Sequence, residues 1–163
     1  MSKPDPADLQ HLRDAIRLSE EARRRGNMPY GAVLVAADGE VLARTGNSIV
    51  TDCDVTAHAE TNAFRAASRL GAERLAGATM YASGEPCPMC SGAIIRLGVR
   101  RVLFGISAAE AMPYMPAATG VMPGSVACRD LLALAPQPIE VHGPLLEEEA
   151  RVPFEALRAR GAA

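Results

Sequence analysis

The sequence has few of the residues that mark several large classes of protein. It has no tryptophan, and aromatic residues make up only 4% of its 163 residues. Little material is therefore available for stacking the bases of a single-stranded nucleic acid. No apolar run reaches the roughly 18–20 residues of a membrane-spanning helix. The polar start, MSKPDPADLQHL, is unlike a secretory signal, so we expect a cytoplasmic protein with no membrane partner.

Excess positive charge is also missing. The 17 basic residues are balanced by 19 acidic ones, for a net charge of −2. A dedicated nucleic-acid binder usually carries a basic excess, so the balance disfavours a nucleic-acid partner. The length and the 48% share of hydrophobic residues fit one domain with its own core. We expect a single domain over residues 1–163.

The hydrophobic pattern predicts alternating helices and strands. Asp38-Gly39, between two runs of valine and leucine, is typical of a two-residue hairpin turn. Because helices separate most strands after this hairpin, we expect a three-layer α/β/α fold with a mixed sheet. The expected helices span residues 5–26, 58–70, 87–98, 125–134 and 145–160, the last bent or interrupted near Pro153. The hairpin spans 30–45, later strands span 78–83, 100–106 and 138–143, and 107–124 is a loop.

Cysteine is scarce, yet two of the four cysteines, Cys87 and Cys90, lie three positions apart behind a proline. Without a secretory signal, disulfides are disfavoured and metal binding or catalysis becomes the better explanation. At the start of a helix this spacing puts both sulfurs on one side of the first turn, where thiolates are favoured. His58, at another helix start, is the natural third ligand. Three ligands leave a fourth tetrahedral position for water, the catalytic zinc pattern.

Glu60, two residues after His58, fits the same interpretation. Zinc lowers the pKa of a bound water, and a neighbouring carboxylate can take that proton and pass it to a substrate nitrogen. His-x-Glu followed by Pro-Cys-x-x-Cys is the zinc deaminase signature, in which the glutamate is not a ligand. The alternatives are a redox pair or a structural zinc site with Cys53 as fourth ligand. Both leave Glu60 unexplained.

The chain resembles the cytidine/deoxycytidylate deaminase superfamily, in the branch of guanine deaminases, cytosine-type deaminases and tRNA adenosine deaminases. The resemblance covers about residues 9–157, and its segments are GAVLV (31–35), GN (46–47), TAHAE (56–60), EPCPMCSGAI (85–94) and RVLFG (101–105). It implies a five-stranded mixed sheet with helices on both faces. It also implies a homodimer.

The resemblance assigns roles to single residues as well. It implies that His58, Cys87 and Cys90 bind Zn²⁺ and that Glu60 shuttles the proton. Asn47 stands at the position of a substrate-contacting asparagine. The backbone around Ala59 and Cys87 would hold the ring, and the backbone carbonyl near Ser83 would accept from the departing amine. Glu110 is a further candidate substrate contact, and Tyr114 and Met115 are candidate lid residues. Glu85 is expected to orient the cysteine helix or to hydrogen-bond backbone.

The pattern specifies the reaction better than the substrate. The first hypothesis is a deaminase of a small free nucleobase or related ring, of guanine, cytosine or aminotriazine type. Alternatives are a tRNA adenosine-to-inosine deaminase, a cytidine-type nucleoside deaminase, and a zinc-binding scaffold without activity. The C-terminal arginines, Arg151, Arg158 and Arg160, are offset by glutamates in residues 147–155, which disfavours a grip on a tRNA backbone.

Overall fold

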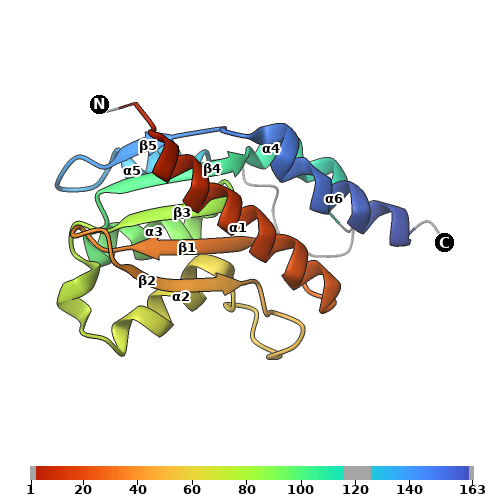
Figure 1. Cartoon of the computed structure of the whole chain (residues 1–163), viewed down its shortest axis with the longest axis horizontal. Helices are drawn as coiled ribbons and strands as arrows, with labels where there is room; N and C mark the ends of the chain where they lie inside the picture. Colours follow the sequence, from red (N-terminus) through yellow and green to blue (C-terminus); the bar gives the residue numbers. More distant parts are fainter. Residues whose placement is uncertain (1–2, 116–125, 162–163) are drawn as a thin grey trace.

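The fold is a five-stranded mixed sheet between two layers of helices (Figure 1). The computed structural model describes residues 3–115 and 126–161. The strands are β1 (Gly31–Val35), β2 (Val41–Gly46), β3 (Thr79–Gly84), β4 (Arg101–Ile106) and β5 (Glu140–His142). Their order in the sheet is β2-β1-β3-β4-β5. β1 is antiparallel to β2 and β3, whereas β3, β4 and β5 are parallel. The predicted fold class is confirmed.

The helices divide between the two faces of the sheet. The described helical segments are α1 (Pro6–Arg24), α2 (Ala59–Ser68), η1 (Ala72–Leu75), α3 (Pro88–Leu97), α4 (Ala108–Ala111), η2 (Met112–Tyr114), α5 (Cys128–Leu132) and α6 (Glu147–Gly161). α1 and α6 lie on one face, and α2, α3 and α5 lie on the other (Figure 1). No helix within the described ranges is long and apolar enough to cross a membrane.

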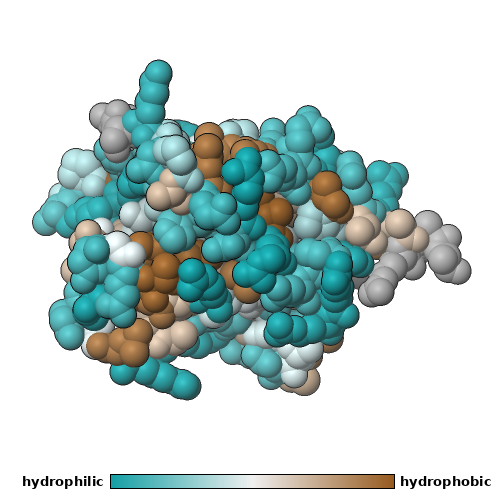
Figure 2. Space-filling model, in the orientation of Figure 1, coloured by the Kyte–Doolittle hydropathy of each residue, from teal (hydrophilic) through white to brown (hydrophobic). Residues whose placement is uncertain are grey.

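Alternation along β1 explains why the sheet is covered on both faces. Ala32 and Leu34 join the core under α2, α3 and α5, while Val33 and Val35 pack with Leu12 of α1. Successive side chains of a strand point to opposite faces, so each face receives its own apolar set. The outer surface on the α1 side is largely hydrophilic (Figure 2). The sequence therefore closes a core on each side of one sheet.

Strand direction gathers several loops at one edge of the sheet. In the ladders, Gly31 pairs with Gly46, Ala32 with Ala82, and Gly84 with Ile106. The start of β1 and the ends of β2, β3 and β4 therefore lie at the same edge. In sheets with parallel strands, ligand sites form outside the carboxyl ends of those strands. This edge receives the loops that carry the sequence motifs.

Local details differ from the sequence-based expectations. The hairpin turn has three residues instead of two, because Ala36 and Glu40 close it by a hydrogen bond and Gly39 adopts a φ of +89°. α6 continues through Pro153 without interruption. The short helices η1, α4 and η2 were not predicted, and the last two occupy part of the expected 107–124 loop. Positions 116–124 of that loop lie outside the described residues.

Candidate metal centre and active site

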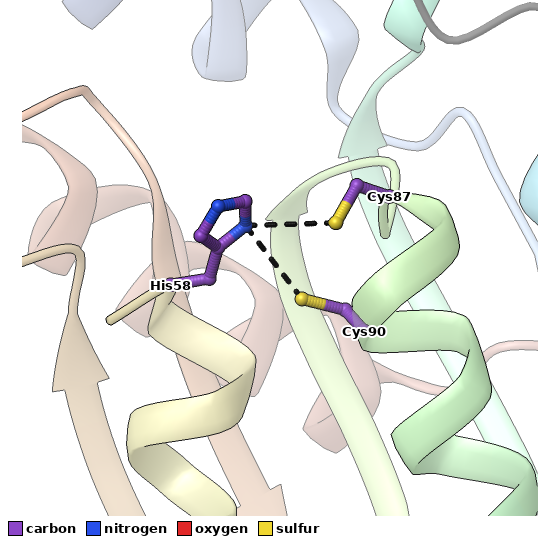
Figure 3. A group of neighbouring side chains, drawn as sticks. All are labelled: His58, Cys87 and Cys90. Carbon is purple, nitrogen blue, oxygen red and sulfur yellow. Dashed lines mark hydrogen bonds between the residues drawn. The ribbon is translucent and has the colours of Figure 1, made fainter. Parts of the chain in front are cut away.

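Three predicted ligands meet between the starts of two helices. His58 is the N-cap residue of α2, and Cys87 is the N-cap residue of α3, with Cys90 one turn further on. The Nδ1 atom of His58 lies 3.6 Å from the Sγ of Cys87 and 3.7 Å from the Sγ of Cys90. All three donor atoms lie within 4.8 Å of one another. Figure 3 shows the imidazole facing both sulfurs across the gap between the helices.

These separations suit a tetrahedral metal ion. Zinc binds thiolate sulfur at about 2.3 Å and imidazole nitrogen at about 2.0–2.1 Å. In a tetrahedron those bond lengths leave nitrogen and sulfur about 3.5–3.6 Å apart. The measured 3.6 and 3.7 Å are therefore the separations that one shared zinc ion requires. One histidine and two cysteines also form a donor set that zinc uses in catalytic sites.

Glu60 lies beside this group and is almost completely buried, with 4% of its surface exposed. Its Oε2 accepts a hydrogen bond from the Sγ of Cys90 at 3.5 Å. It stands in the first turn of α2, two residues after His58. A buried carboxylate normally needs a charged or hydrogen-bonding partner. Here the partners belong to the metal-ligand group, which fits the proton-transfer role predicted for Glu60.

Burial and mutual contacts shift the acidities of these groups. Burial raises the pKa of Glu60 to about 7. A hydrogen bond from Cys90 is the main cause that lowers the pKa of Cys87 to about 4, and contact with His58 lowers it further. The hydrogen bond with Cys87 raises the pKa of His58 and that of Cys90. The metal-free group thus favours one thiolate beside an imidazolium, and a metal ion would displace the remaining protons.

Asn47 lies directly after β2 and is held close to the loop that precedes His58. Its backbone N–H donates to the carbonyl of Tyr30 at 2.9 Å, and its Oδ1 accepts from the N–H of Ile49 at 3.2 Å. The N–H of Ser48 donates to the carbonyl of Ala57 at 3.0 Å. Asn47 is buried, with 3% of its surface exposed. The structure therefore brings the Asn47 loop to the His58 end of α2.

Two of the three predicted backbone contacts, Ala59 and Ser83, are deeply buried. Ala59 opens α2, and its carbonyl accepts a hydrogen bond from the hydroxyl of Thr45 at 2.8 Å. Ser83 lies in β3, and its hydroxyl accepts from the N–H of Gly31 at 2.9 Å. A Cβ added at Gly105 would lie 2.4 Å from the Ser83 carbonyl oxygen, so this carbonyl faces β4 closely. The substrate roles of both backbones stay predictions.

Two residues at the site were not identified from the sequence. Burial raises the pKa of Tyr30, and the negative charges of Glu60 and Cys87 raise it further. The side-chain amide of Asn62 donates to the carbonyl of Gly46 at 3.0 Å and to the hydroxyl of Ser48 at 2.9 Å. Tyr30 directly precedes GAVLV, and Asn62 lies one turn after His58. The available sequence signal for both residues was their position next to a motif.

Other candidates stand apart from the metal-ligand group. Cys53 is exposed and its thiol contacts the carbonyl of Val50, so it is not placed as a fourth ligand. Glu110 is exposed and lies 3.5 Å from the guanidinium of Arg151 on α6. Tyr114 packs near Phe154, with ring centroids 6.3 Å apart. All four cysteines are free thiols.

Glu85 hydrogen-bonds backbone, as expected. Its Oε2 accepts from the N–H of Ala108 at 3.0 Å and its Oε1 accepts from the N–H of Cys128 at 2.9 Å. These amides belong to the first residues of α4 and α5. Glu85 therefore connects the loop that precedes Cys87 to two distant parts of the chain.

A mixed sheet with helices on both faces, and a His-Cys-Cys group with a buried glutamate at its edge, is typical of the hydrolytic deaminases that use zinc. Comparison with known families agrees. Residues 6–106 match the model of the cytidine and deoxycytidylate deaminase zinc-binding region. The chain belongs to this family and is a hydrolytic deaminase of the cytidine and guanine deaminase superfamily.

Relatives within this family carry different substrate names. A probable cytosine deaminase of Schizosaccharomyces pombe is 41% identical over 148 residues, which cover 91% of this chain and 90% of that protein. A tRNA-specific adenosine deaminase of Bacillus subtilis is 42% identical over 99 residues. That match covers 60% of this chain and 61% of the relative, so it spans less than two thirds of either protein.

Solved structures show the same division. A chain from a study of A-to-I editing by tRNA:A34 deaminases has a TM-score of 0.71 and 34% identity, and the match covers 89% of this chain and 99% of that one. A guanine deaminase of Bacillus subtilis has a TM-score of 0.61 and 30% identity, covering 98% and 95%. The family and reaction class are therefore shared, while the named substrates differ.

Proposed function

We propose that residues 1–163 form a single zinc-dependent domain that removes the exocyclic amine of a small free nucleobase or related ring. The observation that carries the proposal is the burial of Glu60 beside the His58, Cys87 and Cys90 group, 3.5 Å from Cys90. In this proposal the histidine and the two cysteines hold zinc. The zinc ion, when bound, supplies a water made acidic enough to act as a nucleophile at neutral pH.

Glu60 would move the protons of the reaction. It accepts a proton from the attacking water, whose oxygen forms a bond to the ring carbon that bears the amine. Glu60 passes this proton to a ring nitrogen. It then takes the second proton from the hydroxyl group now bonded to the ring carbon and gives it to the exocyclic nitrogen, so that a carbonyl forms as the carbon–nitrogen bond breaks and ammonia leaves. General acid–base catalysis of this kind contributes about 10²–10⁴-fold to a rate. Exclusion of water around the buried carboxylate supports this role.

The remaining site residues would orient the ring. Asn47 is buried next to the His58 end of α2 and carries a side-chain amide suited to a ring nitrogen or oxygen. The backbones at Ala59 and Ser83 are assigned the ring contact and the acceptance of the leaving amine. Tyr30 adds an aromatic side chain to the same edge.

A free base is favoured over tRNA by charge. The guanidinium of Arg151 contacts Glu110 at 3.5 Å and Glu148 at 3.6 Å, so its charge is largely offset. A grip on a nucleic-acid backbone depends on available cations. Coverage does not separate the two substrates, because the match to the tRNA:A34 deaminase chain covers 89% of this chain and the match to the S. pombe relative covers 91%. Among free bases, the name of the S. pombe relative, a probable cytosine deaminase, points to cytosine. Cytosine is therefore the first base to test, followed by guanine and ammeline.

The test is ammonia release by the zinc-loaded protein. The panel holds cytosine, guanine, adenine, ammeline, their nucleosides and a tRNA anticodon stem-loop. We expect release from a free base, and we expect Glu60→Ala to lower kcat by about 10²–10⁴-fold while the zinc content stays unchanged. Glu148→Ala is the matched control, because that side chain is 91% exposed.

Three results would contradict the proposal. Release from the stem-loop alone would make the protein an RNA editor, and release from nucleosides alone would make it a nucleoside deaminase. Full activity of Glu60→Ala would refute the proposed proton transfer. The homodimer stays a prediction, which the mass of the native protein in solution tests.

A further inference from the structure

A single carboxylate links three separate segments at the edge of the sheet. Glu85 directly follows β3, and its own backbone N–H donates to the carbonyl of Ile106 at 2.9 Å. Its two side-chain oxygens accept from different partners, Ala108 at 3.0 Å and Cys128 at 2.9 Å. The side chain is half-buried. Both carboxylate oxygens of Glu85 are therefore hydrogen-bonded, and both partners lie far from Glu85 in the sequence.

The partners of Glu85 are the starting points of the two segments that flank residues 116–125. Ala108 opens α4 directly after β4, and Cys128 opens α5. α4 has a second anchor, because the N–H and the hydroxyl of Ser107 both contact the Oε1 of Glu147 at 3.2 Å. Within residues 3–115 and 126–161, the start of α5 has no second carboxylate anchor. Glu85 thus fixes both starts relative to the loop that carries Cys87.

α4 is linked to the surroundings of the candidate active site through the side chain of Tyr30. α4 continues into η2 and Met115, whose Sδ lies 3.7 Å from the hydroxyl of Tyr30. The carbonyl of Tyr30 accepts a hydrogen bond from the N–H of Asn47 at 2.9 Å, and its ring lies against Gly84, where an added Cβ would be 2.7 Å from the Cε1 of Tyr30. A displacement of α4 would therefore move a neighbour of the site. Displacements of about 1 Å can cost about 10²-fold in rate.

We propose that Glu85 is a positioning residue. Its carboxylate clamps the starts of α4 and α5 to the loop that carries Cys87, and so keeps Met115, which follows α4, in place against Tyr30. The inference rests on the proposed function for its catalytic consequence. Both side-chain oxygens of Glu85 bond to the amides of Ala108 and Cys128, and not to the predicted zinc ligands. Its effect should therefore fall on substrate binding more than on zinc binding.

The test compares Glu85→Gln, Glu85→Asp and wild type, with Glu148→Gln as the matched control on an exposed side chain. Glutamine is nearly isosteric but presents one donor where an acceptor is needed, so either Ala108 or Cys128 loses its partner. Aspartate keeps both acceptors on a shorter side chain. Hydrogen exchange of peptides covering residues 107–111 and 126–132 reports the clamp directly, without a substrate.

We expect exchange at one of the two amides, Ala108 or Cys128, to become at least about tenfold faster in Glu85→Gln, as removal of a hydrogen bond to a charged group predicts. At unchanged zinc content, kcat/KM should fall by about 10–100-fold, mainly through a higher KM, and Glu85→Asp should recover part of the loss. Glu148→Gln should match wild type in every measurement.

Unchanged exchange would overturn the clamp. Faster exchange with an unchanged kcat/KM, or a loss that follows zinc content alone, would reduce Glu85 to a structural residue and overturn the positioning role. If the wild-type protein releases ammonia from no substrate, the proposed function fails, and the exchange measurement alone then decides whether the clamp exists.

Discussion

Acid should weaken this fold in a way that depends on one carboxylate, Asp8, in the first turn of α1. Its Oδ1 accepts from Arg101 at 2.6 Å and from the hydroxyl of Tyr81 at 2.7 Å, while its Oδ2 accepts from Arg101 at 2.7 Å. The Asp8 side chain is only 5% exposed. This cluster fastens α1 to β3 and β4 on the face away from the metal centre.

The size of the effect follows from the pKa of Asp8. Burial by itself raises this pKa, but the hydrogen bonds from Arg101 and Tyr81 outweigh burial and lower the pKa from 3.8 to about 2. A lowered pKa means that the unfolded chain takes up the proton first as the pH falls. The contribution, about 2.4 kcal/mol, is therefore complete above about pH 5 and declines as the pH approaches 2. Linkage gives a loss of about 1 kcal/mol by pH 3.

The assay is urea unfolding of wild type and Asp8→Asn at pH 6 and pH 3. Asparagine cannot titrate, so the stability difference between the two proteins isolates Asp8 from all other groups, the zinc ligands included. We expect the free energy of unfolding of wild type to exceed that of Asp8→Asn at pH 6, and the difference to be about 1 kcal/mol smaller at pH 3. A difference of the same size at both pH values would refute the reasoning.

Two further predictions concern zinc and packing. His58→Ala should lower the zinc content after dialysis well below that of wild type, because a two-cysteine site lacks the third ligand; equal metal content by elemental analysis would contradict the assignment. Phe154→Ala should destabilise the fold by about 3–5 kcal/mol, because Phe154 is fully buried and packs edge-on against Tyr30 at 5.2 Å; an unchanged urea midpoint would contradict it.

The sequence predicted the metal-ligand group because its signal is local. Cys87 and Cys90 lie one turn apart on one helix, and His58 and Glu60 share the first turn of another. The strands followed from runs of alternating or continuous apolar residues. Such patterns depend on the neighbours of each residue in sequence, so they are visible without a structure.

Contacts between distant segments had no such signal. Glu85 meets Ala108 and Cys128, which are 23 and 43 residues away. No periodicity encodes partners at these separations. The sequence therefore predicted that Glu85 orients the cysteine helix or hydrogen-bonds backbone, but not which distant segments it joins. The extra hairpin residue was missed because a bulge between Leu34 and Val35 changes the register. The bulge depends on how the paired strand fits, which the Asp-Gly signal alone does not specify.

The placement of His58 shows where this fold has exchanged stability for chemistry. His58 occupies the N-cap of α2, yet its side chain makes no capping hydrogen bond and faces the two sulfurs instead. Serine, aspartate or asparagine at an N-cap stabilises a helix by about 1 kcal/mol relative to a non-capping residue. His58→Asn would therefore make the metal-free chain more robust while removing a ligand. Selection for stability alone would therefore favour a capping residue in place of His58, at the cost of the proposed zinc site.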